Sequence, residues 1–324
     1  MKRFQPVDAW RNIGRRLGGL QGEVAGAWSQ AALRLCLVSG LVALLGGCRG
    51  VLDPQGPVGA GEKLILLDAL GIMLAIVIPV IVATLVFAWW FRASNSRARF
   101  LPDWEFSGRI ELVVWSIPAL VIMFLGGLAW ISSHDLDPAR PLPAGQVQPL
   151  QVEVVSLDWK WLFIYPDQGV ASVNELVVPA GAPLHLRLTS GSVMTAFFVP
   201  QLGSMIYTMN RMVTQLNLRA DRPGSYLGLA SQFSGDGFSG MHFQTRAVTP
   251  AAFAAWVAAA KSTGPVLDGP SYETLSRQSQ DVPPFTYRSA APGLFEQIAT
   301  GRLPPGPGPR SSGSAPAVAS GRAP

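Results

Sequence analysis

The stretch LILLDALGIMLAIVIPVIVATLVFAWWF, residues 64–91, decides the fold class, because it contains only one charged side chain, Asp68. A second stretch, LVVWSIPALVIMFLGGLAWI, residues 112–131, contains none. A helix needs about 20 apolar residues to cross the roughly 30 Å hydrocarbon core of a bilayer. Both stretches exceed or reach that length. The sequence therefore predicts two transmembrane helices, each kinked at its internal proline, Pro79 or Pro118.

The loop between the two spans, residues 92–109, carries more arginines than acidic residues. Its charged residues are Arg92, Arg97, Arg99 and Arg109 against Asp103 and Glu105. Loops with an excess of positive charge stay in the cytoplasm. The mature N-terminus and everything after residue 131 are therefore expected on the outer side, in the periplasm.

The first 47 residues have the anatomy of a secretory signal. They contain six basic and two acidic residues, so they account for +4 of the chain's net charge of +5. The basic balance therefore belongs to a leader and gives no reason to expect a nucleic-acid partner. An apolar run, residues 35–45, ends in Leu45-Gly46-Gly47-Cys48, which resembles a bacterial lipoprotein box. We expect Cys48 to carry the lipid and to become the new N-terminus; an ordinary buried cysteine is the alternative.

A β-rich pattern follows a proline-rich linker at residues 138–149. Short alternating or apolar runs at residues 151–155, 162–166 and 184–188 are bounded by Gly and Pro, which predicts a small sandwich or Greek-key barrel. Residues 250–261 predict a helix, because Phe253, Trp256 and Val257 fall on one face. A second short helix is expected at residues 294–300.

Two stretches of the β region resemble the copper-binding domain of haem-copper oxidase subunit II. They are SGSVMTAFFVP, residues 190–200, and YLGLASQFSGDGFSGMHF, residues 226–243. The family patterns are close to S-x-D-V-x-H-S-F-x-x-P and Y-x-G-x-C-S-E-x-C-G-x-x-H-x-x-M. The family's copper ligands fall here on Thr195, Ala230, Gln232, Ser234, Phe238 and Met241. Only the methionine is retained, so the resemblance implies a copper domain that holds no metal.

The chemistry of the remaining side chains supports that expectation. A copper electron-transfer site needs thiolate and imidazole ligands, and a thioether alone is a weak ligand. The two cysteines, Cys36 and Cys48, lie upstream of the β region. His242 next to Met241 could be read as a remnant of the site, but adjacent residues on a strand point to opposite faces. Met241 is therefore expected in the core.

Further motifs are similar to subunit II of the cytochrome bo-type ubiquinol oxidases, and the resemblance covers about residues 45–298. They are FAWWFRASN (87–95), RIELVVWSIP (109–118), DWKWLFIYP (158–166) and FSGMHF (238–243). This resemblance implies an α+β membrane protein, with a two-helix transmembrane hairpin and a periplasmic cupredoxin-like Greek-key β domain. Trp159 and Trp161 are expected to pack in the core and to contact subunit I.

The expected organisation has six parts. They are a lipoprotein signal peptide (1–47), a periplasmic stub (48–63), the hairpin (64–131, with spans 64–91 and 112–131 and the cytoplasmic loop 92–109), a copper-free cupredoxin-like domain (140–262), a helical C-terminal extension (263–302) and a disordered tail (303–324) rich in Pro, Gly, Ser and Ala.

The resemblance also implies a function. The chain is expected to be subunit II of a proton-pumping terminal quinol oxidase in a bacterial inner membrane, not catalytic by itself. It would hold no cofactor, whereas subunit I would hold the haems, the copper and the quinol site, with subunits III and IV and membrane lipid as further partners. The alternatives are a menaquinol oxidase subunit II, a cytochrome c oxidase subunit II with a degenerate copper site, and a lipid-anchored cupredoxin-like binding module.

One residue of the hairpin is a candidate for chemistry. Glu111 lies at the cytoplasmic start of the second span. In the family, a glutamate at this position lies at the mouth of a proton channel of subunit I. A carboxylate at a membrane boundary can load and release protons if partial burial raises its pKa. The alternative is a charge that anchors the end of the helix at the interface.

Overall fold

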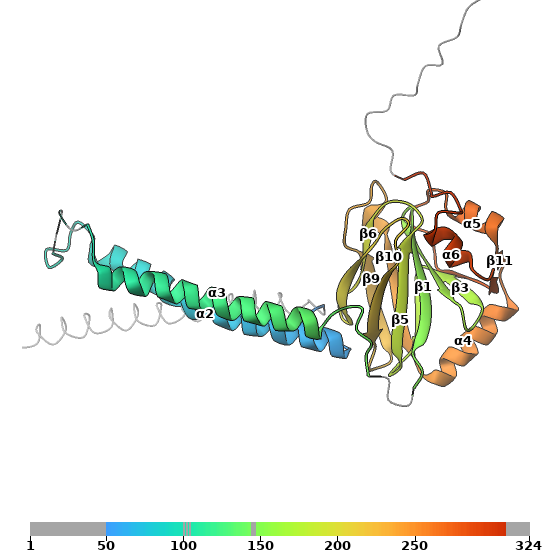
Figure 1. Ribbon diagram of the computed structural model, residues 1–324, viewed down its shortest axis with the longest axis horizontal. Helices are drawn as coiled ribbons and strands as arrows, with labels where there is room; N and C mark the ends of the chain where they lie inside the picture. The colour runs from blue at the N-terminus through green and yellow to red at the C-terminus, as the bar shows by residue number, and fades with distance from the viewer. Residues whose placement is uncertain (1–49, 100, 102, 104, 144–146, 309–324) are drawn as a thin grey trace, which may run out of the picture. The chain divides into compact units, whose positions relative to one another are not determined.

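The computed structural model describes residues 50–99, 101, 103, 105–143 and 147–308. The predicted signal peptide and Cys48 lie outside the described residues. Figure 1 shows a helical hairpin and a β domain with short helices packed beside its strands.

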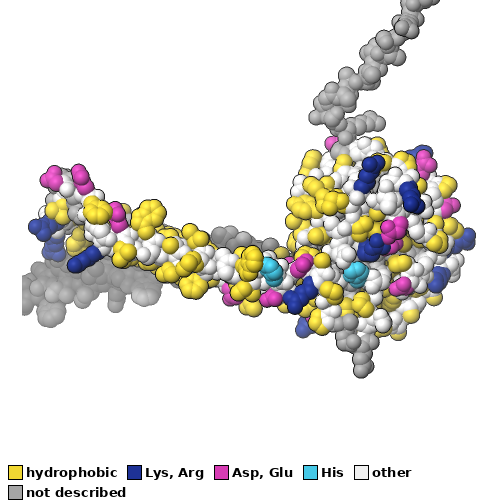
Figure 2. All heavy atoms as spheres, viewed as in Figure 1, with side chains coloured by type: hydrophobic (Ala, Val, Ile, Leu, Met, Phe, Trp, Pro, Cys, Tyr) yellow, Lys and Arg dark blue, Asp and Glu magenta, His cyan; other side chains and the backbone are white. Residues whose placement is uncertain are grey.

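Two helices form the hairpin, α2 (Pro57–Trp90) and α3 (Gly108–Asp135). Both are long and apolar enough to cross a membrane, and no residue in the most apolar 18-residue window of either is buried within the chain. Apolar side chains cover the hairpin in Figure 2. Helices that are apolar on every side need lipid or other helices around them.

The helices extend beyond the apolar stretches that predicted them. Helix α2 starts seven residues before residue 64, with Pro57 in its first turn, where the missing N–H leaves no hydrogen bond unmade. The polar Glu62 belongs to this extra length, and its Oε1 accepts hydrogen bonds from the backbone N–H and the hydroxyl of Ser204, both at 2.8 Å. Part of the predicted periplasmic stub is therefore helical and bonded to the β domain.

The β domain is a sandwich of two mixed sheets. One has the order β12-β3-β2-β1-β5-β8 and the other β4-β10-β9-β6-β7. The strands of the first sheet are β1 (Leu150–Leu157), β2 (Lys160–Tyr165), β3 (Val170–Val173), β5 (Pro183–Ser190), β8 (Thr214–Arg219) and β12 (Phe285–Tyr287). Those of the second are β4 (Glu175–Pro179), β6 (Thr195–Val199), β7 (Gly203–Thr208), β9 (Gly224–Ala230) and β10 (His242–Val248). Two neighbour pairs, β1–β5 and β4–β10, are parallel.

An aromatic cluster fills the space between the sheets. Phe197 and Phe243 stack with ring centroids 5.0 Å apart, and Trp161 meets both rings edge-on at 5.4 and 5.6 Å. Helix α4 (Pro250–Ser262) closes one side of this core, with the Trp256 ring 5.1 Å from Tyr165. The predicted apolar face of this helix is confirmed.

The C-terminal extension covers the other face of the first sheet. Alternate residues of β2, Leu162 and Ile164, point away from the aromatic cluster and pack under Phe295 and Ile298 of α6 (Leu294–Ala299). Helix α5 (Gly269–Leu275) contributes to the same cluster. Both faces of β2 are therefore buried, which explains its continuous apolar composition.

The structure differs from the sequence-based expectation in this extension. It is not only helical: β12 joins the edge of the first sheet, and β11 (Val266–Leu267) pairs with β13 (Ser289–Ala290). The start of the predicted disordered tail is also held in place. Gly306 and Gly308 donate backbone hydrogen bonds to the Gly191 carbonyl and to Asp158, at 2.7 and 2.9 Å. A buried carboxylate that needs donors explains why residues 303–308 are ordered despite their composition.

Candidate functional site

The six positions at which the resemblance predicts copper ligands come from separate segments of the sequence, and the second sheet brings these segments together. Thr195 opens β6 and Ala230 ends β9, and these strands are neighbours. Met241 immediately precedes β10, and its carbonyl accepts a hydrogen bond from Ala230 N at 3.0 Å. Strand register therefore places the two quoted stretches of sequence side by side.

Hydrogen bonds and apolar contacts fill this cluster. The Thr195 hydroxyl donates to the Gln232 carbonyl at 3.0 Å, and the Ser234 hydroxyl points at the Met241 sulfur at 3.8 Å. Phe238 packs against the core, with its ring 5.6 Å from that of Phe233. The positions form a packed, hydrogen-bonded piece of the domain.

Trp159 lies against the second half of the cluster. Its indole N–H donates to the Ser234 carbonyl at 3.1 Å. Its ring covers Gly237, where a Cβ atom would collide with the indole, so only glycine fits there. Trp159 itself has a positive φ of 64°, which is an uncommon conformation for a bulky residue. Together with the buried Trp161, it forms part of the core.

The side chains at these positions do not fit copper. Threonine, alanine, serine and phenylalanine supply neither thiolate nor imidazole, so the thioether of Met241 is the remaining soft donor of the six. Met241 is buried at 2% exposure, whereas the adjacent His242 is exposed, as strand alternation requires. Within the described ranges, no group of three or more His, Cys, Asp or Glu side chains could hold a metal ion.

A buried pair of charged residues next to this cluster was missed by the sequence-based reasoning. Asp158 accepts hydrogen bonds from the Ser192 hydroxyl at 2.5 Å and from Gly308 N at 2.9 Å. The ammonium group of Lys160 donates to the carbonyls of Asp158 and Arg277 at 3.1 and 2.8 Å. Both residues are at most 2% exposed. The motif D-W-K-W carried a signal for this pair, namely two charges within a strongly apolar run.

The pair joins three parts of the chain. Lys160 also donates to the Ser279 hydroxyl at 2.6 Å, which fastens the C-terminal extension. Ser192 belongs to the first quoted stretch, the one that contains Thr195. Burial lowers the pKa of Lys160 to about 8, although the nearby Asp158 carboxylate acts in the opposite direction.

Glu111 lies in the first turn of α3, and its backbone N–H bonds the carbonyl of Ser107, the residue that caps the helix. Its side chain is exposed to solvent in this chain. A carboxylate in the first turn of a helix interacts favourably with the helix dipole. The structure places Glu111 and the six predicted copper-ligand positions in separate elements, so they do not form one site.

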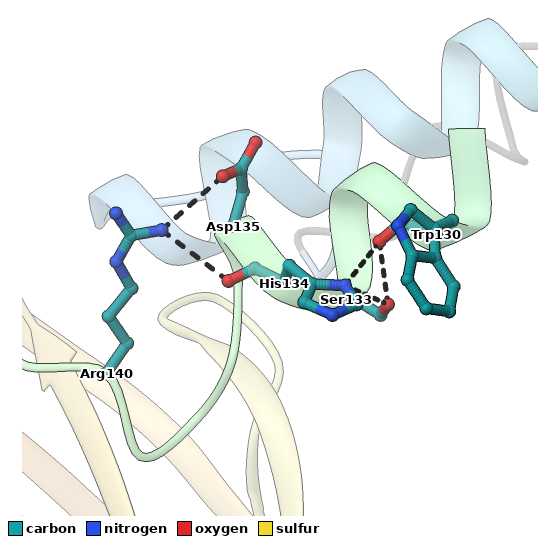
Figure 3. A network of polar contacts seen from close by, with 5 residues as sticks. All are labelled: Trp130, Ser133, His134, Asp135 and Arg140. Atoms are coloured by element: carbon teal, nitrogen blue, oxygen red, sulfur yellow. Dashed lines mark hydrogen bonds and ion pairs between the residues drawn. The ribbon is translucent and has the colours of Figure 1, made fainter. Parts of the chain in front are cut away.

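A polar network closes the other end of α3 (Figure 3). His134 Nδ1 lies 2.8 Å from the Trp130 carbonyl, and the two rings are 4.6 Å apart. Arg140 reaches back to the Asp135 carboxylate at 3.4 Å and to the His134 carbonyl at 3.5 Å. A cation near the last carbonyls of a helix interacts favourably with its dipole. The network therefore stabilises the point where the helix passes into the linker.

Comparison with known proteins gives one family and several relatives. Residues 168–248 match the family described as cytochrome C oxidase subunit II, periplasmic domain. Cytochrome bo(3) ubiquinol oxidase subunit 2 of Pseudomonas aeruginosa is 48% identical, over 79% of this chain and 78% of its own length. Ubiquinol oxidase subunit 2 of Acetobacter aceti is also 48% identical, over 79% of this chain and 83% of its own.

Among solved structures, the periplasmic domain of subunit II of the cytochrome oxidase of Bradyrhizobium japonicum is similar. It is 26% identical, with a TM-score of 0.35, and the match covers 38% of this chain and 98% of that domain.

Proposed function

The chain belongs to the family of ubiquinol oxidase subunit 2, and from that premise we propose that it supports a terminal quinol oxidase without carrying electrons itself. The oxidase is an oxidoreductase complex, and this chain is one of its subunits. A membrane hairpin and a periplasmic β domain are the two parts that it contributes.

One observation carries the proposal: packed side chains without copper-binding chemistry occupy the ligand positions. A soluble electron donor needs an acceptor at the periplasmic surface, whereas ubiquinol is lipid-soluble and reaches its site within the membrane. Haems, copper and the quinol site then belong to subunit I. Loss of the ligands in this chain has no effect on that electron path.

The test uses the whole complex, purified through a tag on this chain in mild detergent. Haem should co-purify, and the complex should reduce oxygen with ubiquinol but not with reduced cytochrome c. Sustained turnover with reduced cytochrome c, or a stoichiometric copper species with near-infrared absorption in this chain, would contradict the proposal. A tagged chain that brings no haem with it would favour the binding-module alternative.

The same proposal gives Glu111 a role in proton entry: its carboxylate takes up the protons that enter the oxidase. The support is its position in the first turn of α3, next to the arginine-rich loop, with its side chain exposed to solvent. A titratable group at that point can take protons from bulk water and pass them into a low-dielectric channel.

Glu111→Gln should slow oxygen reduction on the order of tenfold while haem content stays normal. Glu111→Asp keeps the carboxylate and should be milder. Glu105→Gln, in the same loop but outside the helix, is the matched control and should leave turnover unchanged. If turnover of Glu111→Gln equals that of the wild type from about pH 6 to 9, the carboxylate only anchors the helix.

Cys48 carries a lipid and residues 1–47 are removed, in a chain held in the bacterial inner membrane with its β domain in the periplasm. The lipoprotein box is the support. Mass spectrometry of the subunit checks it: a retained leader or an unmodified Cys48 would contradict it. Cys48→Ser should still assemble with subunits I, III and IV, since two spans hold a chain far more firmly than one lipid.

A further inference from the structure

A hollow of about 710 Å³ lies at the tip of the hairpin, in the loop between the two spans. Its walls combine two arginines, Arg92 and Arg99, with two apolar side chains, Phe91 and Leu101, and the amide of Asn95. Charged side chains gather at this end of the hairpin in Figure 2. A pocket with a basic part and an apolar part suits an amphiphile with a negative head.

The hollow lies at the depth of lipid headgroups. The apolar part of α2 after Asp68 runs to Trp90, about 33 Å at 1.5 Å per residue, enough to cross the hydrocarbon core. Because the β domain matches a periplasmic domain, the opposite end of a two-span hairpin faces the cytoplasmic leaflet. Basic pockets at that boundary attract anionic headgroups.

Arg92 is held in place by its neighbours. Its guanidinium lies 5.1 Å from the centre of the Trp89 ring, Nε donates to the Ser94 hydroxyl at 3.0 Å, and one terminal nitrogen donates to the Trp89 carbonyl at 3.3 Å. A guanidinium has five donors in a planar fork, so these two bonds leave most of them available. A fixed fork with spare donors suits phosphate oxygens.

The arginines of the loop form no ion pair within the part of the chain that the structure describes, although Asp103 and Glu105 belong to the same loop. The ion pairs found there involve Arg140, Arg187, Arg219 and Arg246, and none involves an arginine of residues 92–109. The negative end of the α2 dipole does not oppose an anion strongly either, since Arg92 and Asn95 already donate to the last carbonyls, those of Trp89 and Trp90.

We propose that this hollow binds the phosphodiester headgroup of an anionic phospholipid of the cytoplasmic leaflet. Arg92 and Arg99 hold the phosphate. Phe91 and Leu101, exposed at 59% and 56%, contact the first carbons of the acyl chains. The lipid then fills the hairpin tip and fixes the depth of the loop in the membrane.

The test measures lipid binding to the purified, delipidated oxidase complex by native mass spectrometry and thermal stabilisation. Phosphatidylglycerol, phosphatidylcholine and inorganic phosphate are compared at constant ionic strength. The double variant Arg92→Gln/Arg99→Gln removes the lining charges. Arg97→Gln/Arg109→Gln is the matched control, because it removes the same charge from the same loop outside the hollow.

Wild-type complex should bind phosphatidylglycerol selectively, the lining variant about tenfold more weakly, and the control within about threefold of wild type. Equal losses of lipid affinity in both variants would show that the loop attracts anionic lipid only through its overall charge, and would overturn the proposal. So would equal binding of phosphatidylcholine, or saturation by inorganic phosphate alone. If the lining variant does not assemble, the single variant Arg99→Gln replaces it, because no hydrogen bond of the Arg99 side chain is found among the described residues. Its lipid binding should be about fivefold weaker than that of the wild type.

Discussion

The hairpin and the β domain differ in which side chains they bury and which they expose. The hairpin leaves large apolar residues uncovered, with Trp115 at 75% and Leu112 at 69% exposure. The β domain buries even charged residues, with Asp158 at 2% and Lys160 at 1%. The difference shows where each part finds its partners: the hairpin needs lipid and other subunits, whereas the β domain surrounds Asp158 and Lys160 with donors and acceptors of its own.

The largest expected difference between the two regions concerns apolar contacts. Phe243→Ala removes a ring that lies 5.0 to 5.6 Å from Phe197, Phe163 and Trp161. It should lower the free energy of unfolding of the β domain by about 4 kcal/mol. Phe124→Ala, on the hairpin and 65% exposed, should change it by less than about 1 kcal/mol. Denaturant unfolding of the chain purified alone in detergent measures both, and a loss for Phe124→Ala as large as that for Phe243→Ala would contradict the contrast between the two regions.

The second contrast concerns the buried charge of Lys160 and the pH dependence of stability that it causes. The pKa of Lys160 is lowered by burial to about 8, against about 10.4 in an unfolded chain. Between these values the unfolded chain binds more protons, so the stability of the β domain should rise with pH relative to Lys160→Met. Below about pH 8 the difference between the two proteins should be constant. Lys261→Met, on the exposed face of α4, is the control; a Lys160→Met profile parallel to wild type would contradict the argument.

The smallest effect is expected where the hairpin meets the linker. Arg140 and Asp135 form an ion pair with side chains 60% and 67% exposed (Figure 3). Exposed pairs contribute between zero and about 1 kcal/mol. Arg140→Gln should therefore change the thermal midpoint by no more than about 2 °C. A larger shift that persists at high salt would mean that this junction behaves like the interior of the β domain.

Sequence reasoning was most successful where local composition decides structure. The structure confirms the helices at the two apolar stretches, the strands around residues 151–155 and 184–188, and the helix that begins at Pro250, all of which follow from apolar composition, periodicity and turn residues. It failed in the C-terminal extension. Strands of two or three residues, such as β11 and β12, carry no periodic signal of their own, and they form because a longer strand is already available to pair with them.

In the candidate site, too, some features follow from residue type and others only from contacts between distant residues. Thr195, Ala230, Ser234 and Phe238 stand where the resemblance predicts copper ligands, and their residue types alone exclude thiolate and imidazole chemistry at those positions. How the side chains at these positions are packed depends on partners distant in the chain, such as Trp159 against Gly237 and Ser234.

By itself, the sequence determined the two long apolar helices and the ligand types that the β domain lacks, because hydropathy and ligand type are properties of residues. Only the tertiary structure decided that Asp158 and Lys160 are buried and that they fasten residues 277, 279 and 308. The physical reason is that a buried charge is tolerated only when donors and acceptors surround it. Those groups come from segments up to 150 residues away along the chain, whose meeting no local pattern records.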